Sequence, residues 1–224
     1  MARRTDALAA IARDLGVPCG TYAVDVADVA AVRAAAEDFT ARFGLPDLVI
    51  ANAGVSAGTS GAEAEDLAAL ERILRTNVVG LAASLQPFVA PMRARGAGVL
   101  VGVASVAGFR GLPGAGAYSA SKAAAIAWLE SLRVELSGSG VAVVTLCPGY
   151  VDTPMTRVNR HPMPFLLDAD VAARRMARAI AARRTFVVVP WQMALVGALL
   201  RRLPNRLYDL ALKRAPRKPR KLPL

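Results

Sequence analysis

The 224-residue sequence has two cysteines, one histidine and few aromatic residues, and each shortage narrows the functions available to it. Cys19 and Cys147 are too few and too far apart for a disulfide framework or a metal site. We expect both to be small buried residues in a reducing compartment. The single histidine, His161, lies in the proline-rich stretch N-R-H-P-M-P-F, so we favour a loop residue near an entrance over a histidine-based triad.

No obvious membrane anchor or secretory leader is expected. Residues 186–200 are apolar but too short, and they contain Pro190, whereas a spanning helix needs roughly 20 apolar residues. The first residues, M-A-R-R-T-D, are polar and lack the apolar run of a signal peptide. The sequence therefore predicts a cytoplasmic protein.

The net charge of +11 is concentrated at the C-terminus. Residues 201–224 contain nine Lys/Arg and one Asp, a net +8, which leaves +3 for residues 1–200. A basic groove across the domain is not supported, and the tail has almost no aromatic residues to stack on bases, so nucleic-acid binding is not expected. The basic tail fits two alternatives: a disordered solvated segment, or one that makes peripheral contact with an anionic membrane surface.

Apolar periodicity predicts one domain of alternating helices and strands over residues 1–200, followed by the basic tail, residues 201–224. We expect helices at about 5–15, 29–43, 64–95, 118–136 and 169–182, and strands at 21–26, 48–51, 98–104, 141–146 and 186–189. This alternation predicts an α/β fold of the Rossmann type, a three-layer αβα sandwich around a parallel sheet. The strand at 48–51 is apolar throughout, as in a buried parallel strand.

In such sheets, ligands bind at the carboxyl ends of the strands. The residues best suited to binding or catalysis each follow a predicted strand: Asp25, Asn52–Gly54, Ser105 and Pro148–Gly149. We expect these residues to meet at one edge of the sheet.

Tyr118 and Lys122 are four residues apart, so they share one face of the predicted helix. A cation beside Tyr118 would lower the phenol pKa from about 10 towards neutral pH. Ser105 could donate a hydrogen bond to a carbonyl oxygen beside that phenol. Such a pair is also common on solvated helix faces, but together the three residues can move a proton on or off an alcohol oxygen while a hydride moves elsewhere.

The run A-S-V-A-G-F-R-G-L-P-G-A-G-A-Y-S-A-S-K, residues 104–122, resembles the active-site segment of the short-chain dehydrogenase/reductase family. The thirteen residues from Ser105 to Tyr118 agree with that family. Three further motifs are similar to family motifs: A-N-A-G at 51–54, T-N-V-V-G at 76–80 and P-G-Y-V-D-T at 148–153.

The resemblance implies catalytic roles for four residues: Asn77, Ser105, Tyr118 and Lys122. Tyr118 would be the general acid or base, Ser105 would polarise the substrate oxygen, and Asn77 would hold a water that links Lys122 to solvent. The resemblance also implies a cofactor site, in which Lys122 binds the nicotinamide ribose and Arg3 pairs with the 2′-phosphate of NADP, which we prefer to NAD. The other implied cofactor-binding residues are Asp25 and Val26 at the adenine, Asn52, Ala53 and Gly54 along the cleft, Tyr118, and Pro148, Gly149, Val151 and Thr153 around the nicotinamide.

One family feature is missing from the sequence. The family begins with a strand, a T-G-x-x-x-G-x-G turn and a helix that bind the pyrophosphate. Here the first residues resemble the stretch just after the family's second strand, so we expect the recorded chain to lack the first β-α-β unit. Either the natural protein extends upstream of Met1, which we favour, or the shorter chain is genuine and leaves strand edges unpaired.

The resemblance predicts an NAD(P)-dependent oxidoreductase that acts on a small carbonyl or alcohol compound. An apolar substrate is expected, because residues 186–200 would form a lid and a subunit contact, and the family favours homodimers and homotetramers. The alternative is a non-catalytic binding or scaffold protein that lost cofactor binding with the missing glycine motif.

Overall fold

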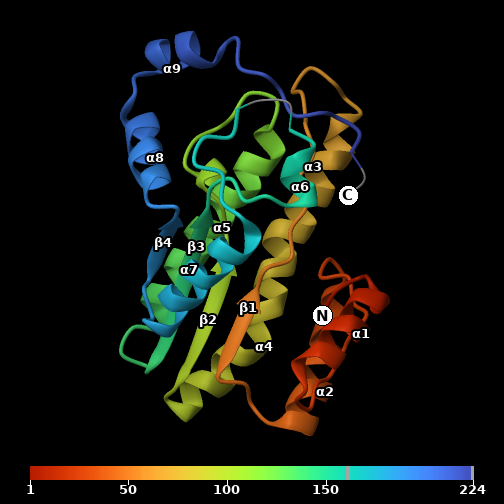
Figure 1. Ribbon diagram of the computed structural model, residues 1–224. Coiled ribbons are helices and arrows are strands. Elements are labelled where there is room, and N and C mark those ends of the chain that lie inside the picture. The colour runs from red at the N-terminus through yellow and green to blue at the C-terminus, as the bar shows by residue number, and fades with distance from the viewer. Residues whose placement is uncertain (160–161, 223–224) are drawn as a thin grey trace.

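Four parallel strands form a single sheet in the computed structural model, which describes residues 1–159 and 162–222 (Figure 1). The strands are β1 (Leu48–Ala51), β2 (Gly98–Val103), β3 (Val141–Pro148) and β4 (Phe186–Val189), and they pair in the order β1-β2-β3-β4. His161 lies outside the described residues.

Helices cover both faces of this sheet. On one face, α4 (Gly80–Arg95) and α5 (Gly116–Glu135) pack over β1–β3, and α2 (Val29–Phe43) packs on α4. On the other face, α7 (Ala169–Ala181) covers Val101, Val144 and Leu146 with Met176 and Ile180. The predicted three-layer α/β sandwich with a parallel sheet is therefore confirmed.

The predicted long helix divides into α3 (Asp66–Leu74), a π-helical turn (Arg75–Val79) and α4. The run of residues 66–95 is long and apolar enough to cross a membrane by length and composition alone. Its apolar side chains have a different use here, because Leu81, Leu85, Phe88 and Met92 of α4 pack into the core beneath the sheet.

The strand predicted at residues 21–26 does not form. Ala23 pairs with Ala2 in one isolated bridge, and Val26 packs on Gly80, where an added β-carbon would lie 2.7 Å from the Val26 side chain. A β-strand needs a neighbour along its length to satisfy its backbone groups. Within the described residues, this segment has such a neighbour only at Ala2, so its β-branched composition alone was misleading.

Two further expectations about burial are wrong. Leu48 and Ile50 of β1 are 43% and 47% exposed, because they lie on the face covered by α7, which packs against β3 and β4, whereas β1 lies at the edge of the sheet. Cys147 is buried as expected, whereas Cys19 is exposed. Helix α1 (Thr5–Leu15) ends before Gly16 as predicted, although Arg4 and not Thr5 or Asp6 is its N-cap; it buries none of its residues and leaves Ile11 and Leu15 exposed.

The C-terminal segment folds back over the carboxyl end of the sheet (Figure 1). It contains α8 (Gln192–Arg202) and α9 (Asn205–Leu212). The residues after α9, 213–222, are called the C-terminal strap. The Arg110 guanidinium donates to the carbonyl of Leu203 at 2.7 Å and to the Asn205 side chain at 2.8 Å, and it stacks on the Tyr208 ring. The alternative of a disordered solvated tail is therefore wrong for the described residues, while membrane contact stays a prediction.

Candidate active site

Three strand ends bring the predicted site residues to one edge of the sheet. Asn52–Gly54 follow β1, Ser105 follows β2 after Ala104, and Pro148–Gly149 close β3. Asp25 does not follow a strand, because the strand predicted at residues 21–26 does not form. Its Oδ1 accepts a hydrogen bond from the Ala27 amide at 3.0 Å, as in an Asx turn.

Ser105 is buried at the point where β2 gives way to a 3₁₀ turn (Val106–Gly108). Its Oγ accepts from the Ala107 amide at 3.1 Å, which fixes the side chain as the cap of that turn. The hydroxyl proton points to the Pro148 carbonyl oxygen at 3.4 Å, a long contact for an O–H donor. The Ser105 hydroxyl can therefore turn from the Pro148 carbonyl to donate to an acceptor that lies closer.

Tyr118 lies in the first turn of α5, with Lys122 one turn later on the same face, as the spacing predicts. Burial raises the pKa of Tyr118, and a hydrogen bond with Ser105 offsets part of that rise. The Lys122 Nζ lies 5.8 Å from the Tyr118 ring centroid and donates to the Val103 carbonyl at 2.8 Å. The expected lowering of the Tyr118 pKa by Lys122 is not among the causes acting here, and it stays a prediction for the cofactor complex.

Lys122 itself is a buried cation. Its side chain is nearly inaccessible, and burial lowers its pKa to about 8. The neighbouring Cys147 thiol is also buried, which raises its pKa to about 12 and keeps it neutral. Lys122 thus titrates close to physiological pH, as is common for residues that take part in proton transfer.

Asn77 is fully buried in the π-helical turn between α3 and α4. Its Oδ1 accepts from the Val55 amide at 2.8 Å, and its Nδ2 donates to the Val55 carbonyl and to Ser121 Oγ, both at 2.9 Å. The Ser121 hydroxyl in turn donates to the Tyr118 carbonyl at 2.7 Å. This chain of hydrogen bonds connects the loop after β1, the π turn and the helix that carries Tyr118, and π turns often mark functional positions.

Gly54 lies where this network meets Lys122. A β-carbon at Gly54 would be 3.3 Å from Asn77 Oδ1 and 3.5 Å from Lys122 Nζ. Glycine therefore allows the A-N-A-G turn to approach both residues closely. Asn52 and Ala53 of the same turn are exposed to solvent.

A cavity of about 400 Å³ opens beside Ser105 and Tyr118. Its other walls are mostly apolar and include Met155, Met193 and Val196. The sequence expectation that residues 186–200 cover the substrate is in keeping with Met193 and Val196 on this wall, while Trp191, Leu195 and Leu199 are exposed.

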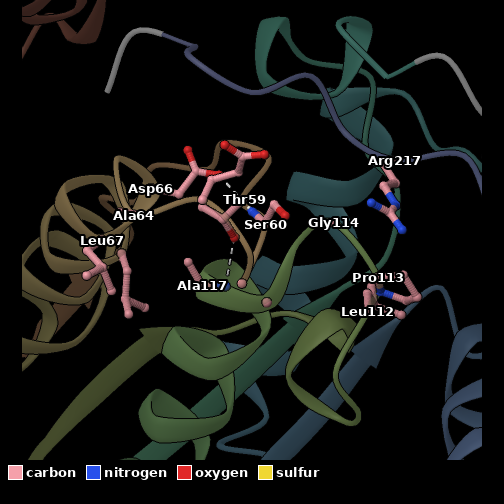
Figure 2. Close-up of a pocket in the computed structure, with 14 residues that line it drawn as sticks. Thr59, Ser60, Ala64, Asp66, Leu67, Leu112, Pro113, Gly114, Ala117 and Arg217 are labelled. Carbon is pink, nitrogen blue, oxygen red and sulfur yellow. Dashed lines mark hydrogen bonds between the residues drawn. The ribbon is translucent and has the colours of Figure 1, made fainter.

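A second cavity, of about 530 Å³, lies between the loop at Thr59–Asp66 and the turn at Leu112–Gly114 (Figure 2). It is larger but contains none of Ser105, Tyr118 and Lys122. The chemistry of the candidate site is therefore in the smaller cavity.

The remaining predicted cofactor residues lie in two groups. Val151 and Thr153 are half-buried in the loop after β3, where Val151 bridges to Leu167 and Thr153 forms a capping box with Thr156 at α6 (Pro154–Arg157). At the other end of the chain, Arg3 lies 3.9 Å from the Asp25 carboxylate, and both side chains are about half exposed. Val26 is buried against α4.

These positions fit a nicotinamide dinucleotide unequally. A nicotinamide would find polar groups beside the smaller cavity, namely the Ser105 hydroxyl and the buried Lys122, and the Gly54 backbone that approaches Lys122 closely. At the diphosphate end, the described residues contain no glycine-rich turn before a helix N-terminus, the usual phosphate cradle. Near Asp25, the described cations include Arg3 and also Arg75, whose Nε donates to the Ala27 carbonyl at 3.2 Å.

Sequence reasoning missed two parts of this region. Ser121 joins Asn77 to the Tyr118 backbone, and its place three residues after Tyr118 in Y-S-A-S-K was a usable signal, since i and i+3 share a helix face. The C-terminal strap also contributes to the cavity through Pro216 and Lys218. No local pattern in the sequence indicated that contact.

Comparison with known proteins identifies the family. A family model described as short chain dehydrogenase matches residues 1–164. The chain is 41% identical over 203 residues to an uncharacterized oxidoreductase of Myxococcus xanthus, which covers 91% of this chain and 80% of the relative. It is 39% identical over 150 residues to 2-dehydro-3-deoxy-L-rhamnonate dehydrogenase (NAD(+)) of a Sphingomonas species, which covers 67% of this chain and 60% of that relative.

A solved structure gives the same result. L-sorbose reductase from Gluconobacter frateurii, complexed with NADPH and L-sorbose, matches with a TM-score of 0.74 at 25% identity, over 84% of this chain and 83% of that chain. The protein therefore belongs to the short-chain dehydrogenase family, a family of oxidoreductases with a Rossmann-type fold. The resemblance of the active-site segment and its companion motifs is confirmed at the level of the family.

Proposed function

We propose that this protein is an NAD(P)-dependent oxidoreductase that interconverts a carbonyl compound and its alcohol, with Tyr118 as the general acid or base. The observation that carries the proposal is the cavity wall formed by Ser105 and Tyr118, with Lys122 and Asn77 buried behind it. The family relatives include dehydrogenases and a reductase, which supports the same class of reaction.

The bound dinucleotide would supply or accept the hydride. Ser105 would turn its hydroxyl proton from the Pro148 carbonyl to the substrate oxygen and so polarise the C–O bond. Tyr118 would give its proton to that oxygen during reduction and take it back during oxidation. Because burial raises the pKa of Tyr118, the phenol is protonated at neutral pH and ready to act as the acid.

Lys122 and Asn77 would serve the return of the proton. With a pKa of about 8, Lys122 can change protonation near neutral pH, and Gly54 leaves room for it beside the Asn77 amide. The three hydrogen bonds of Asn77 hold the π turn rigidly against this region. We therefore infer that Asn77 positions the relay and that Lys122 takes part in it.

Nucleotide binding and turnover test the proposal directly. The full chain should enhance the fluorescence of NADPH or NADH on titration and oxidise the reduced nucleotide when given a panel of aldehydes and ketones. A chain that binds neither nucleotide would overturn the proposal and favour the non-catalytic binding or scaffold protein.

We further propose NADP as the preferred cofactor, through Arg3. A guanidinium pairs well with a phosphate, and the 3.9 Å contact of Arg3 with Asp25 is a weak, exposed ion pair that a phosphate can replace. We expect NADPH to bind about tenfold more tightly than NADH, and Arg3→Met to remove this preference. Arg4→Met is the matched control, because Arg4 is the exposed neighbour. A wild-type preference for NADH, as the name of the Sphingomonas relative indicates for that enzyme, would reject the assignment.

The assembly state is the last part of the proposal. Trp191, at the N-cap of α8, forms an exposed apolar stripe with Leu195 and Leu199 of that helix. This stripe supports the expected homodimer or homotetramer, since such faces usually lie in interfaces.

A further inference from the structure

The cavity beside Tyr118 has an apolar wall with one cation in it. Most of the side chains that line it are apolar or neutral, among them Leu112, Met155, Met193, Val196 and Leu200. Lys218 is the only charged residue among the described residues that line the cavity. A single charge in such a wall defines which end of a ligand can lie against it.

The backbone of the C-terminal strap fixes Lys218 in place. The Gly58 amide donates to the Pro219 carbonyl at 2.9 Å, and Gly58 bridges to Arg220. A β-carbon at Gly58 would lie 2.1 Å from the Lys218 carbonyl oxygen, so the strap rests directly on a glycine backbone. Close backbone contact of this kind requires glycine and limits where Lys218 can move.

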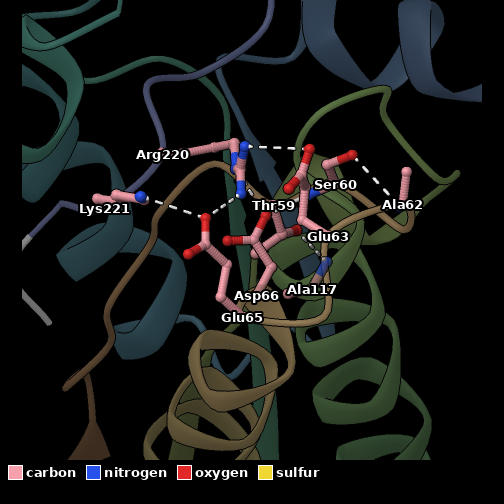
Figure 3. A network of polar contacts seen from close by, with 9 residues as sticks. All are labelled: Thr59, Ser60, Ala62, Glu63, Glu65, Asp66, Ala117, Arg220 and Lys221. Atoms are coloured by element: carbon pink, nitrogen blue, oxygen red, sulfur yellow. Dashed lines mark hydrogen bonds and ion pairs between the residues drawn. The ribbon is translucent and has the colours of Figure 1, made fainter.

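Arg220 anchors the strap two residues further on (Figure 3). Its guanidinium contacts Glu63 at 3.6 Å, Glu65 at 2.9 Å and Asp66 at 2.8 Å, and Asp66 is buried. Lys221 also pairs with Glu65, at 3.2 Å. The acidic residues near the strap are therefore occupied by Arg220 and Lys221.

Lys218 has only neutral partners among the described contacts. Its Nζ donates to Ser56 Oγ at 2.9 Å and to the Met155 carbonyl oxygen at 3.4 Å, and none of the described ion pairs includes it. Burial lowers the pKa of this lysine. A half-buried ammonium with neutral acceptors has lost hydration without gaining a counter-charge. A bound anion would restore the counter-charge.

We propose that Lys218 binds a carboxylate of the substrate, so that the site takes hydroxy acids and keto acids in preference to neutral alcohols and ketones. This inference rests on the proposed function, since it names the substrate class of the same cavity. One ammonium in a mostly apolar wall matches the single charge of a monoanion with an apolar body, whereas the double charge of a phosphate would be matched by only this one cation among the described lining residues. Arg220 is a positioning residue, because it holds the strap that carries Lys218.

Ligand binding tests the inference without turnover. The full-length protein, with NADP present, is titrated by calorimetry with butanoate, hexanoate and octanoate and with the three matching amides. We expect carboxylates to bind at least about tenfold more tightly than their amides, the ratio expected for a charge-assisted hydrogen bond. Lys218→Met should abolish this ratio, and Lys218→Arg should retain it. Lys213→Met, an exposed lysine elsewhere on the tail, is the matched control and should leave the ratio unchanged.

The outcomes separate this inference from the proposed function. Equal binding of carboxylates and amides by the wild type, or a ratio that survives in Lys218→Met, overturns the role of Lys218. Reduction of neutral ketones with no carboxylate preference would do the same while leaving the oxidoreductase intact. Conversely, if the protein selects carboxylates through Lys218 but reduces no carbonyl compound, the role of Lys218 is supported and the proposed oxidoreductase activity is overturned.

Discussion

Tyr118→Phe is expected to lower kcat by about 10²- to 10⁴-fold, the usual contribution of a positioned acid or base. The substitution keeps the aromatic ring that packs at the start of α5 and removes only the hydroxyl. The hydroxyl interacts with Ser105, whose effect is to lower the Tyr118 pKa, so its loss should change the free energy of unfolding by no more than about 1 kcal/mol. Initial rates with NADPH and urea unfolding of the same preparations measure the two effects.

Tyr22→Phe is the control for this substitution. The Tyr22 hydroxyl donates to the Asp38 carboxylate at 2.6 Å on the surface of the N-terminal layer, away from the residues that line the cavity. Its loss should leave kcat unchanged. Full reductase activity in Tyr118→Phe would eliminate Tyr118 as the acid.

The pH profile of Ser105→Ala adds a readout that a structural role would not change. In the oxidation direction the phenolate is the active form, so the rate rises with pH through the pKa of Tyr118. A Ser105 hydroxyl that turns from the Pro148 carbonyl to the phenol oxygen lowers that pKa. Removing Ser105 should therefore shift the rising limb to higher pH, in addition to lowering kcat.

The active-site segment is the part of the protein that the sequence predicts best. Ser105, Tyr118 and Lys122 lie within one strand–turn–helix unit, so local spacing decides their arrangement. Asn77 is predicted only from the similarity of T-N-V-V-G to a family motif; in the structure it lies in the π-helical turn and reaches the loop after β1 through its hydrogen bonds with Val55. The loops after β1, β2 and β3 do follow the rule that a parallel sheet brings them to one edge, which needs only the order of elements. Both kinds of reasoning work because they depend on local periodicity and on chain topology.

Features that depend on long-range partners could not be predicted in this way. The Arg220 side chain meets Asp66 across 154 residues of sequence, and no periodicity links the two. Residues 21–26 have a composition typical of a strand but little to pair with, and β1 is apolar but lies at an edge. In each case, composition describes the residue and not its neighbour, and the neighbour decides whether a strand or a contact forms.

Lys122 is expected to destabilise the folded protein while it is needed for turnover. In the folded protein its pKa is about 8, below the ordinary value of 10.5, because the charged form is buried. That difference corresponds to a cost of up to about 3 kcal/mol at neutral pH, since each pKa unit is worth about 1.4 kcal/mol. The hydrogen bond from Lys122 to the Val103 carbonyl stabilises the folded state by about 1 kcal/mol and offsets part of this cost.

Lys122→Met should therefore stabilise the protein by about 2 kcal/mol near pH 7 while it abolishes turnover. The gain has a defined pH dependence. Between pH 8 and 10.5 the unfolded wild-type chain binds more protons at this residue than the folded one, so the wild type gains stability as the pH rises and the variant does not. The advantage of Lys122→Met should be complete below pH 8 and shrink above it. Urea unfolding across this range measures it, with Lys213→Met, an exposed lysine, expected to show neither effect. A variant less stable than the wild type at every pH would mean that the ammonium is well compensated where it lies. The stabilised, inactive protein would instead show that this chain keeps a buried cation at the expense of its own stability, as expected for a residue retained for chemistry.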